Sequence, residues 1–487
     1  MKVYSKKKFR PFNPEEYRKA SYSPEQALGE DDLVFFLLDV LDHIDLTPFY
    51  ARYQGELRGA PPSDPAKMVV LLLYSYCVGI FSSRKIAAAC QRNLAFLAIT
   101  GDDPPDFRTI SDFRKDNLEA FKEVFLSVLR LAREAGLIGL GNVSFDGSKF
   151  KADASRHKAM SYGYMKKEEE RLKAEIDEML KKAQQADAQD DAALGSRRGD
   201  ELPEELKRRE DRLAVIQQAK QRLEEQAKVQ AEEERRRRAQ EEEERQRAGK
   251  KRRGKEPGPV SEVPDDKAQC NFTDPEMKMM PQSNKGWDYS GNCQASVDAT
   301  CQIILACFVT EAANDKEQAV PLACATMENL KQAGVQLPKD ENGETVKIPG
   351  TADTGYYSKE AAEGMAERGF DPYMATGRQK HNQPLEPAKA ACPSGEAGPA
   401  ATTAKKPTET QQAKEKMAQK VKTPQGRAIY ARRKVIIEPV FGQIKEARGF
   451  RQFSLRGLDK VNGEWRLVCL THNLLKLWRY GCAPSRN

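Results

Sequence analysis

The chain has 487 residues, of which 31% are charged and only 8% are aromatic, so part of it is expected to be solvated helix or linker. Its 80 lysines and arginines exceed its 73 acidic residues by 7, and so small an excess indicates nucleic-acid binding only where it is concentrated. Ten scattered cysteines, no Cys-x-x-Cys pair and four histidines argue against a zinc site and for free thiols in a reducing cytoplasm.

No segment has the character of a signal peptide or a membrane helix. Residues 1–10 are basic and lack an apolar core. The longest apolar run, residues 68–81, is shorter than the roughly 20 residues that a membrane span needs. We therefore expect a soluble, cytoplasmic protein with no membrane partner.

The first part of the chain, residues 1–138, is predicted to be a helical domain. Short helices are expected at residues 83–90 and 107–115, with a turn at 101–105 between them. Arg108 and Arg114 lie on the second of these helices, which would fit a DNA-binding helix-turn-helix. Any small helical domain shows such turns, so a purely structural role stays open.

A strand is predicted at residues 142–150, and residues 161–260 then form a charged insertion. Leu172, Ile176, Leu213 and Leu223 belong to apolar series at helical spacing on either side of a break at residues 187–203. We expect two long antiparallel helices. A solvated helical insertion is favoured over a dedicated DNA-binding arm.

Strand and helix patterns alternate in the rest of the chain. Strands are expected at 294–300, 302–310, 346–355 and 372–376, and helices at 316–333, 358–368, 423–448 and 461–480. Residues 378–415 have the composition of a disordered linker. This order is similar to a ribonuclease-H-like α/β fold, a mixed sheet with flanking helices. Its core would comprise residues 139–160, 261–377 and 416–487, with the hairpin inserted after the first strand.

Three acidic residues stand where such a fold would gather them. Asp146 lies within the first strand, Asp353 at the end of a later strand, and Glu438 in an apolar stretch of a helix. Each alone could be an exposed residue or a cap, and Asp298 competes for the second position. Together they suit Mg²⁺ or Mn²⁺, because these ions prefer oxygen ligands, and two such ions can stabilise both oxygens of a phosphodiester exchange.

The surroundings of Glu438 are strongly basic. Residues 421–460 contain ten lysines and arginines against three acids, so the local charge is 10 − 3 = +7. A concentrated positive surface beside an acidic site is what a polyanionic substrate requires. A merely solvated basic helix is the alternative.

Several short motifs resemble those of bacterial insertion-sequence DDE transposases, in particular the insertion-sequence eleven-eighty-two group. They are Phe145-Asp146-Gly147-Ser148-Lys149, Thr273-Asp274-Pro275, Asn314-Asp315-Lys316, Ala352-Asp353-Thr354-Gly355-Tyr356, Ala375-Thr376-Gly377-Arg378-Gln379-Lys380-His381, Arg433-Lys434 with Glu438-Pro439-Val440-Phe441-Gly442, and Gly449-Phe450-Arg451. The resemblance covers about residues 20–165 and 270–480, and the charged hairpin lies outside it.

The resemblance implies that Asp146, Asp353 and Glu438 are catalytic and bind two Mg²⁺ or Mn²⁺ ions. It implies that Tyr430, Arg433 and Lys445 contact DNA near the cleavage site. Lys434 and Arg448, which lie in the same basic segment, are further candidates for contact with DNA. Four residues separate Arg433 from Glu438 where the family's pattern has three, so Lys434 is an alternative to Arg433.

The activity implied is metal-dependent cleavage of double-stranded DNA at the terminal inverted repeats of a mobile element, followed by strand transfer into target DNA. A homodimer on DNA in the bacterial cytoplasm, associated with the nucleoid, is expected. A ribonuclease-H-like nuclease without strand transfer and a catalytically dead DNA-binding scaffold stay open as alternatives.

Overall fold

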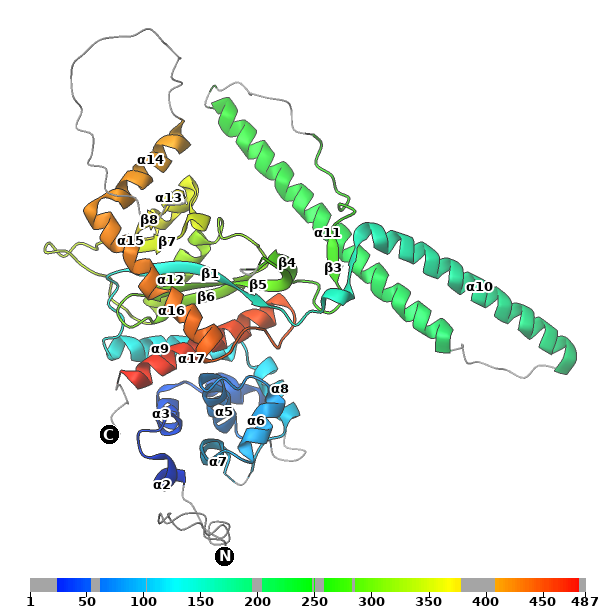
Figure 1. Cartoon of the computed structure of the whole chain (residues 1–487), viewed down its shortest axis with the longest axis horizontal. Coiled ribbons are helices and arrows are strands. Elements are labelled where there is room, and N and C mark those ends of the chain that lie inside the picture. Colours follow the sequence, from blue (N-terminus) through cyan, green and yellow to red (C-terminus); the bar gives the residue numbers. More distant parts are fainter. Residues whose placement is uncertain are drawn as a thin grey trace, which may run out of the picture.

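The computed structural model describes residues 24–53, 62–101, 103–194, 204–247, 249, 258–282, 285–377 and 408–480. A group of N-terminal helices, a central sheet with its covering helices, and a long projecting hairpin make up the molecule (Figure 1). In the described part of the chain, no helix combines the length and apolar character needed to cross a membrane.

The described residues of the N-terminal region form a series of helices. Its elements are α2 (Pro24–Leu28), α3 (Leu33–Val40), η1 (Leu41–His43), α4 (Thr47–Tyr50), η2 (Ala51–Tyr53), α5 (Pro65–Cys77), α6 (Ser83–Cys90), α7 (Leu94–Thr100), α8 (Phe107–Asp116) and α9 (Ala120–Glu134). Asp32 and Asp64 cap α3 and α5 by accepting hydrogen bonds from backbone amides of the first turn. Helix α5 is buried along its length from Met68 to Cys77 and forms the centre of this region.

The expected pair of short helices is interrupted. Helices α6 and α8 pack against each other, but α7, which the sequence analysis did not predict, lies between them in the chain. Asn93 caps α7 by accepting from the Ala95 amide. The tight connection expected of a simple helix-turn-helix is therefore replaced by a third helix.

The sheet is mixed, with β1 (Val143–Lys151) at its centre. On one side β1 pairs antiparallel with β5 (Trp287–Asp298), and the far edge of β5 pairs with β4 (Lys278–Pro281) and β6 (Ile304–Thr310). On the other side β1 pairs parallel with β7 (Ile348–Ala352), which pairs parallel with β8 (Phe370–Met374). The α/β prediction is confirmed at this level.

Strand β5 begins at Trp287, seven residues before the start predicted for it. Residues 288–298 are all buried, so the strand lacks the alternation of buried and exposed positions that marks a half-exposed strand. Its buried polar residues, such as Asn292 and Gln294, find hydrogen-bond partners inside the protein. Their polarity hid the strand from a pattern based on hydrophobicity.

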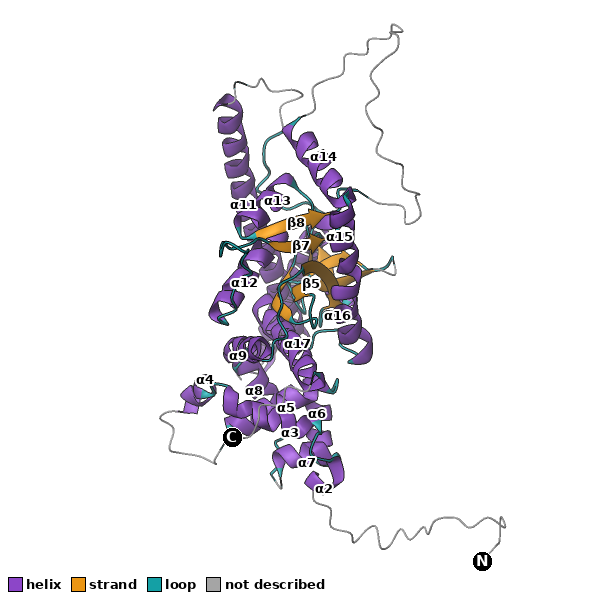
Figure 2. Cartoon of the chain, turned by 90° about the vertical axis from the view of Figure 1, so that its left-hand side faces the viewer, coloured by secondary structure: helices purple, strands orange, loops and turns teal. Residues whose placement is uncertain are grey.

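Helices cover both faces of the sheet. Helices α12 (Ala319–Gln332) and α13 (Lys359–Glu367) lie on one side, and α15 (Pro424–Ile436) and α16 (Glu438–Gly442) on the other (Figure 2). The C-terminal helix α17 (Leu458–Arg479) packs against β6, α5 and α9, and so joins the sheet to the N-terminal helices.

The predicted helical hairpin consists of α10 (Tyr162–Leu194) and α11 (Glu204–Arg247), which project from the body (Figure 1). The short strands β2 (Ala159–Ser161) and β3 (Gln269–Asn271) pair at its base. Leu172, Ile216 and Leu223 form the apolar contact between the helices, flanked by ion pairs. Helix α10 continues to Leu194, beyond the break expected from residue 187.

The predicted linker is shorter than expected at its C-terminal end. Residues 378–407 lie outside the described part of the chain, but α14 (Glu409–Lys422) begins within the stretch assigned to the linker. Thr408 and Gln411 form a reciprocal capping box at its start. The polar composition of this segment masked a helix whose N-terminal signal is visible in the sequence.

Candidate active site

Asp146 lies in the middle of β1, where the antiparallel and parallel halves of the sheet meet. Its side chain is 17% exposed, and its Oδ2 accepts from Nη1 of Arg433 at 2.9 Å. Burial raises the pKa of Asp146 to about 7, with repulsion from Asp353 adding to the effect and attraction to Arg433 opposing it. A carboxylate in this position needs additional positive charge to stay ionised.

The raised pKa predicts a pH dependence of stability. Because folded Asp146 keeps its proton up to about pH 7 while the unfolded chain loses it near pH 4, this residue's contribution to the free energy of unfolding should fall as pH rises between these values. Thermal unfolding without divalent ions from pH 5 to pH 8 measures this effect. Asp146→Asn should flatten the profile, and parallel profiles for the two proteins would contradict the prediction.

Asp353 follows β7 directly. The parallel register pairs Phe145 with Ala352, so the next residue on each strand is an aspartate and the two acids are neighbours. Asp353 caps the turn η4 (Thr354–Tyr356) by accepting from the Gly355 amide at 2.8 Å. Burial raises the pKa of Asp353, and repulsion from Asp315 raises it further.

Glu438 lies at the start of α16, on the face of the sheet that α15 and α16 cover. Its Oε1 accepts from Nη2 of Arg433 at 3.2 Å, so one guanidinium joins the Glu438 and Asp146 carboxylates. The side chain of Glu438 is 52% exposed, while its neighbours Ile437 and Val440 are buried. It therefore lies at the solvent-facing rim of the site rather than inside the apolar stretch.

The unusual spacing between Arg433 and Glu438 has a structural cause. In a continuous α-helix, residues five apart point about 140° away from each other. Here α15 ends at Ile436 and α16 starts at Glu438, with Pro439 in its first turn. Proline cannot donate to the carbonyl four residues before it, and Gln302 donates to that Val435 oxygen instead. The break places both side chains at one site.

Lys445 and Tyr430 flank the three acids. The Lys445 Nζ donates to Ser148 Oγ at 2.7 Å and to the Lys149 carbonyl at 3.0 Å, which fixes it to β1 two residues after Asp146. Lys445 lies in a π-helical turn, η5 (Gln443–Ala447). Burial raises the pKa of Tyr430, whereas attraction to Arg433 opposes that shift.

Two family comparisons bear on this site. The family described as Transposase DDE domain matches residues 387–478, which include Arg433, Glu438 and Lys445. The family described as Transposase domain (DUF772) matches residues 22–116 of the N-terminal helices. No curated protein and no solved structure matches the chain.

These two family matches indicate an insertion-sequence DDE transposase. The chain is accordingly a DNA transposase, and an enzyme of the DDE type. The first family match contains the helix that carries Glu438, while Asp146 and Asp353 lie outside both matched segments. Divalent-metal dependence and a DNA substrate follow from the family in general terms.

Two arginines that the sequence analysis assigned to DNA lie inside the transposase. Arg114 is 4% exposed and donates to the Tyr76 hydroxyl and the Phe81 carbonyl. Arg448 is 8% exposed and donates to Thr471 Oγ1 and the Val468 carbonyl. Neither guanidinium can reach a DNA phosphate without leaving the interior, so we leave both out of the proposed DNA-binding set.

Of the remaining assigned residues, Tyr430, Arg433 and Lys445 are partly buried at the site, and two are exposed. Lys434 is exposed on α15, next to Arg433, and Arg108 is exposed at the start of α8. The Arg108 guanidinium lies 5.6 Å from the centre of the Phe107 ring, and that of Arg84 from α6 lies 5.1 Å from the same ring. Arg84 could not be identified from the sequence as a partner of Arg108, because only the packing of α6 on α8 brings the two residues together.

Asp298, the competing second acid, has a structural role in the transposase. It is fully buried at the end of β5, opposite Val143 rather than Asp146. Its carboxylate accepts from the backbone amides of Gly139 and Leu140 and from the Thr300 hydroxyl. These contacts fasten the loop before β1 to the turn after β5, as expected of a turn residue.

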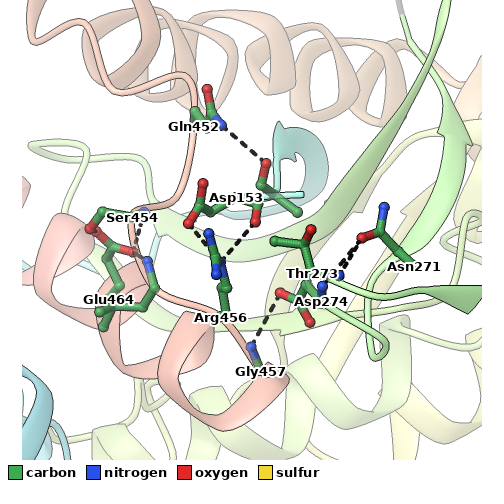
Figure 3. Close-up of polar contacts among 11 residues, drawn as sticks. Asp153, Asn271, Thr273, Asp274, Gln452, Ser454, Arg456, Gly457 and Glu464 are labelled. Atoms are coloured by element: carbon green, nitrogen blue, oxygen red, sulfur yellow. Dashed lines mark hydrogen bonds and ion pairs between the residues drawn. The ribbon is translucent and has the colours of Figure 1, made fainter. Parts of the chain in front are cut away.

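The Thr273-Asp274-Pro275 motif also fastens loops (Figure 3). Asp274 is buried and accepts from the Gly457 amide at 3.2 Å, just before α17. The neighbouring Arg456 pairs with Asp153, which follows β1, at 2.8 Å. The motif thus ties the segment after β3 to the segment between the Glu438 helix and α17.

Asp315 is a fourth acid near the site, and the sequence analysis gave it no role. It lies in the loop between β6 and α12, and its charge raises the pKa of both Asp146 and Asp353. The Asn314-Asp315-Lys316 motif was its only signal in the sequence. Its closeness to Asp146 depends on the turn of the chain after β6.

Proposed function

We propose that Asp146, Asp353 and Glu438 hold divalent ions, Mg²⁺ or Mn²⁺, and that the transposase uses them to cut and join DNA. The observation that carries this proposal is the convergence of acids from β1, from the residue after β7 and from α16 around one guanidinium, that of Arg433. The topology supports a ribonuclease-H-like core, since β1, β5, β6, α12, β7, α13, β8 and α15 follow one another in the expected order.

The residues of the site suit a divalent ion. All of the donors are carboxylate oxygens, the ligands preferred by Mg²⁺ and Mn²⁺. Burial and mutual repulsion raise the pKa values of Asp146 and Asp353, so a cation would favour their ionised forms. In the described part of the chain, no three acidic, histidine or cysteine side chains lie close enough together to hold one ion. Arg433 lies between Asp146 and Glu438 and forms an ion pair with each.

The protein's own groups would position DNA around this centre. Bound ions would stabilise the charge on the attacking and leaving oxygens of the phosphodiester. Arg433 would release one or both carboxylates and turn its guanidinium toward a DNA phosphate. The planar guanidinium can donate to two oxygens of one phosphate at the same time. Lys445, anchored to Ser148, would hold a fixed positive charge beside Asp146. Lys434 and Tyr430 would extend the contact with DNA along α15.

A strand-cleavage assay on element-end DNA tests the proposal. Wild-type protein with Mg²⁺ or Mn²⁺ should nick the element end, and a labelled 3′-hydroxyl end should then be joined to target DNA. The Asp353→Ala and Glu438→Ala variants should do neither while remaining folded. Normal cutting by these variants would refute the triad, and cutting without joined products would indicate a nuclease instead.

The N-terminal helices are proposed to recognise the terminal inverted repeats, with two chains pairing two element ends as a homodimer. Arg84 and Arg108 flank the exposed Phe107 ring and present positive charge at the surface of α6 and α8. Substituting each by glutamine should weaken DNA binding and reduce the slope of log affinity against log salt by about one per arginine.

Fluorescence anisotropy at several salt concentrations measures that slope. Lys122→Gln is the matched control, because Lys122 is exposed on α9, outside the α6–α8 surface. Equal losses in the control and in the Arg84 and Arg108 variants would contradict a DNA-binding role specific to this surface.

A further inference from the structure

A cluster of polar side chains lies behind Asp146, on β5 and the loop after β6. Oδ1 of Asp315 accepts from Nδ2 of Asn292 and from Nε2 of Gln294, each at 2.8 Å. Asn292 and Gln294 are buried and two residues apart on β5, so they share one face of the sheet. Two amide donors on one carboxylate oxygen fix the positions of all three side chains.

The carboxylate also determines which way the Gln294 amide points. An ionised carboxylate only accepts hydrogen bonds, so it takes the nitrogen end of the amide and leaves the oxygen end facing the opposite direction. That oxygen, Oε1, accepts the hydroxyl of Tyr356, which is fully buried. Tyr356 belongs to η4, the turn that Asp353 begins and caps. A continuous chain of hydrogen bonds therefore leads from Asp315 to the turn of Asp353.

The glycine after Asp146 makes room for this cluster. Gly147 pairs with Gln294, so both lie on the face opposite to that of the Asp146 side chain. A Cβ atom on Gly147 would lie 2.4 Å from Gln294 Nε2 and 2.6 Å from Asp315 Oδ1, closer than real atoms approach. The backbone of β1 thus rests directly on the cluster, at the residue next to Asp146.

We infer that Asp315 is a positioning residue, which fixes the Asp353 turn relative to Asp146 through Gln294 and Tyr356. It contacts neither carboxylate directly through a hydrogen bond in the described structure; it holds β1 and η4 in a common frame. The inference rests on the proposed function in one respect, namely that Asp146 and Asp353 act together.

Two substitutions of Asp315 separate positioning from direct ion binding. Asp315→Ala removes the acceptor shared by the two amides, and should lower kcat for strand cleavage about 100-fold, with KM for DNA unchanged, because small displacements at a reacting centre are this costly. Asp315→Asn keeps an acceptor oxygen and should restore most of the activity.

Tyr356→Phe breaks the last hydrogen bond of the series, the one from Tyr356 to Gln294, and should resemble Asp315→Ala. Ser296→Ala is the control, because it removes a buried hydrogen bond to Thr326 elsewhere on β5.

Hydrogen exchange gives a readout that does not depend on activity. The amides of Gly355, Tyr356 and Tyr357 are bonded within the Asp353 turn. In protein without metal or DNA, their exchange should be faster in Asp315→Ala than in wild type, Asp315→Asn or the Ser296 control. Absence of cleavage by wild-type protein would refute the proposed function and leave this test intact. Unchanged exchange in Asp315→Ala, or equal loss of cleavage in both Asp315 variants, would overturn the positioning role.

Discussion

Asp146→Asn should abolish strand cleavage while leaving the fold intact. The amide has nearly the same shape as the carboxylate but carries no negative charge, so it is a poor ligand for a hard divalent ion. We expect a loss of at least about a thousandfold in rate, which corresponds to about 4 kcal/mol of barrier. Because burial raises the pKa of the carboxyl group in the absence of metal, the variant should be no less stable than wild type at pH 7.

The matched control is Asp298→Asn. Asp298 is also a buried aspartate of the β1–β5 pair, but its carboxylate accepts only from the loop before β1 and the turn after β5. Its loss should lower stability and leave the rate per folded molecule within a few-fold of wild type. The rate of cleavage in the presence of Mg²⁺, normalised to the folded fraction from circular dichroism, distinguishes the Asp146→Asn variant from the Asp298→Asn variant. Strong cleavage by Asp146→Asn, or complete loss in Asp298→Asn, would reverse the assignment of the acids.

Arg114→Leu should destabilise the transposase strongly without weakening DNA binding by the folded protein. Nη1 of Arg114 donates to the Tyr76 hydroxyl at 3.0 Å and lies 4.0 Å from Oε1 of Glu464, which is fully buried on α17. Glu464 also accepts from the amides of Ser454 and Leu455. Removing the arginine leaves a buried carboxylate without its cation, a change that typically costs roughly 3–5 kcal/mol.

Urea unfolding of the variant measures this loss. The double variant Arg114→Leu, Glu464→Gln should recover part of the stability, because it removes the uncompensated charge as well. Arg108→Gln should unfold like wild type, since Arg108 is exposed on the same helix. A stable Arg114→Leu protein with weakened DNA affinity would instead support the DNA-binding role that the sequence suggested for Arg114.

This buried network joins the two segments that match transposase families, residues 22–116 and 387–478. Arg114 on α8 and Tyr76 on α5 meet Glu464 on α17, and Trp478 of α17 donates to the Asp31 carbonyl before α3. The helices proposed to bind the terminal repeats are therefore fastened to the helix that packs beneath the sheet. DNA held by the N-terminal region would be placed at a fixed distance from Asp146.

The local sequence determined much of this architecture. The strand around Asp146 and the apolar series of the hairpin depend on neighbouring residues, so they could be predicted from spacing alone. The candidate acids Asp146, Asp353 and Glu438 could be chosen from the sequence because each lies in a recognisable motif. The start of β5 could not be predicted from the sequence, because its buried polar side chains find their hydrogen-bond partners on other elements.

Only the tertiary structure decided what the charged side chains do. Arg114 and Arg108 lie on one short helix and look alike in the sequence, yet one is buried against α17 and the other is exposed. Arg433 reaches Glu438 because the helix breaks at Ile437, and Asp315 approaches Asp146 because the chain turns back after β6. A charge acquires its partner through contacts between residues far apart in the chain, and the free energy of burying it depends on that partner.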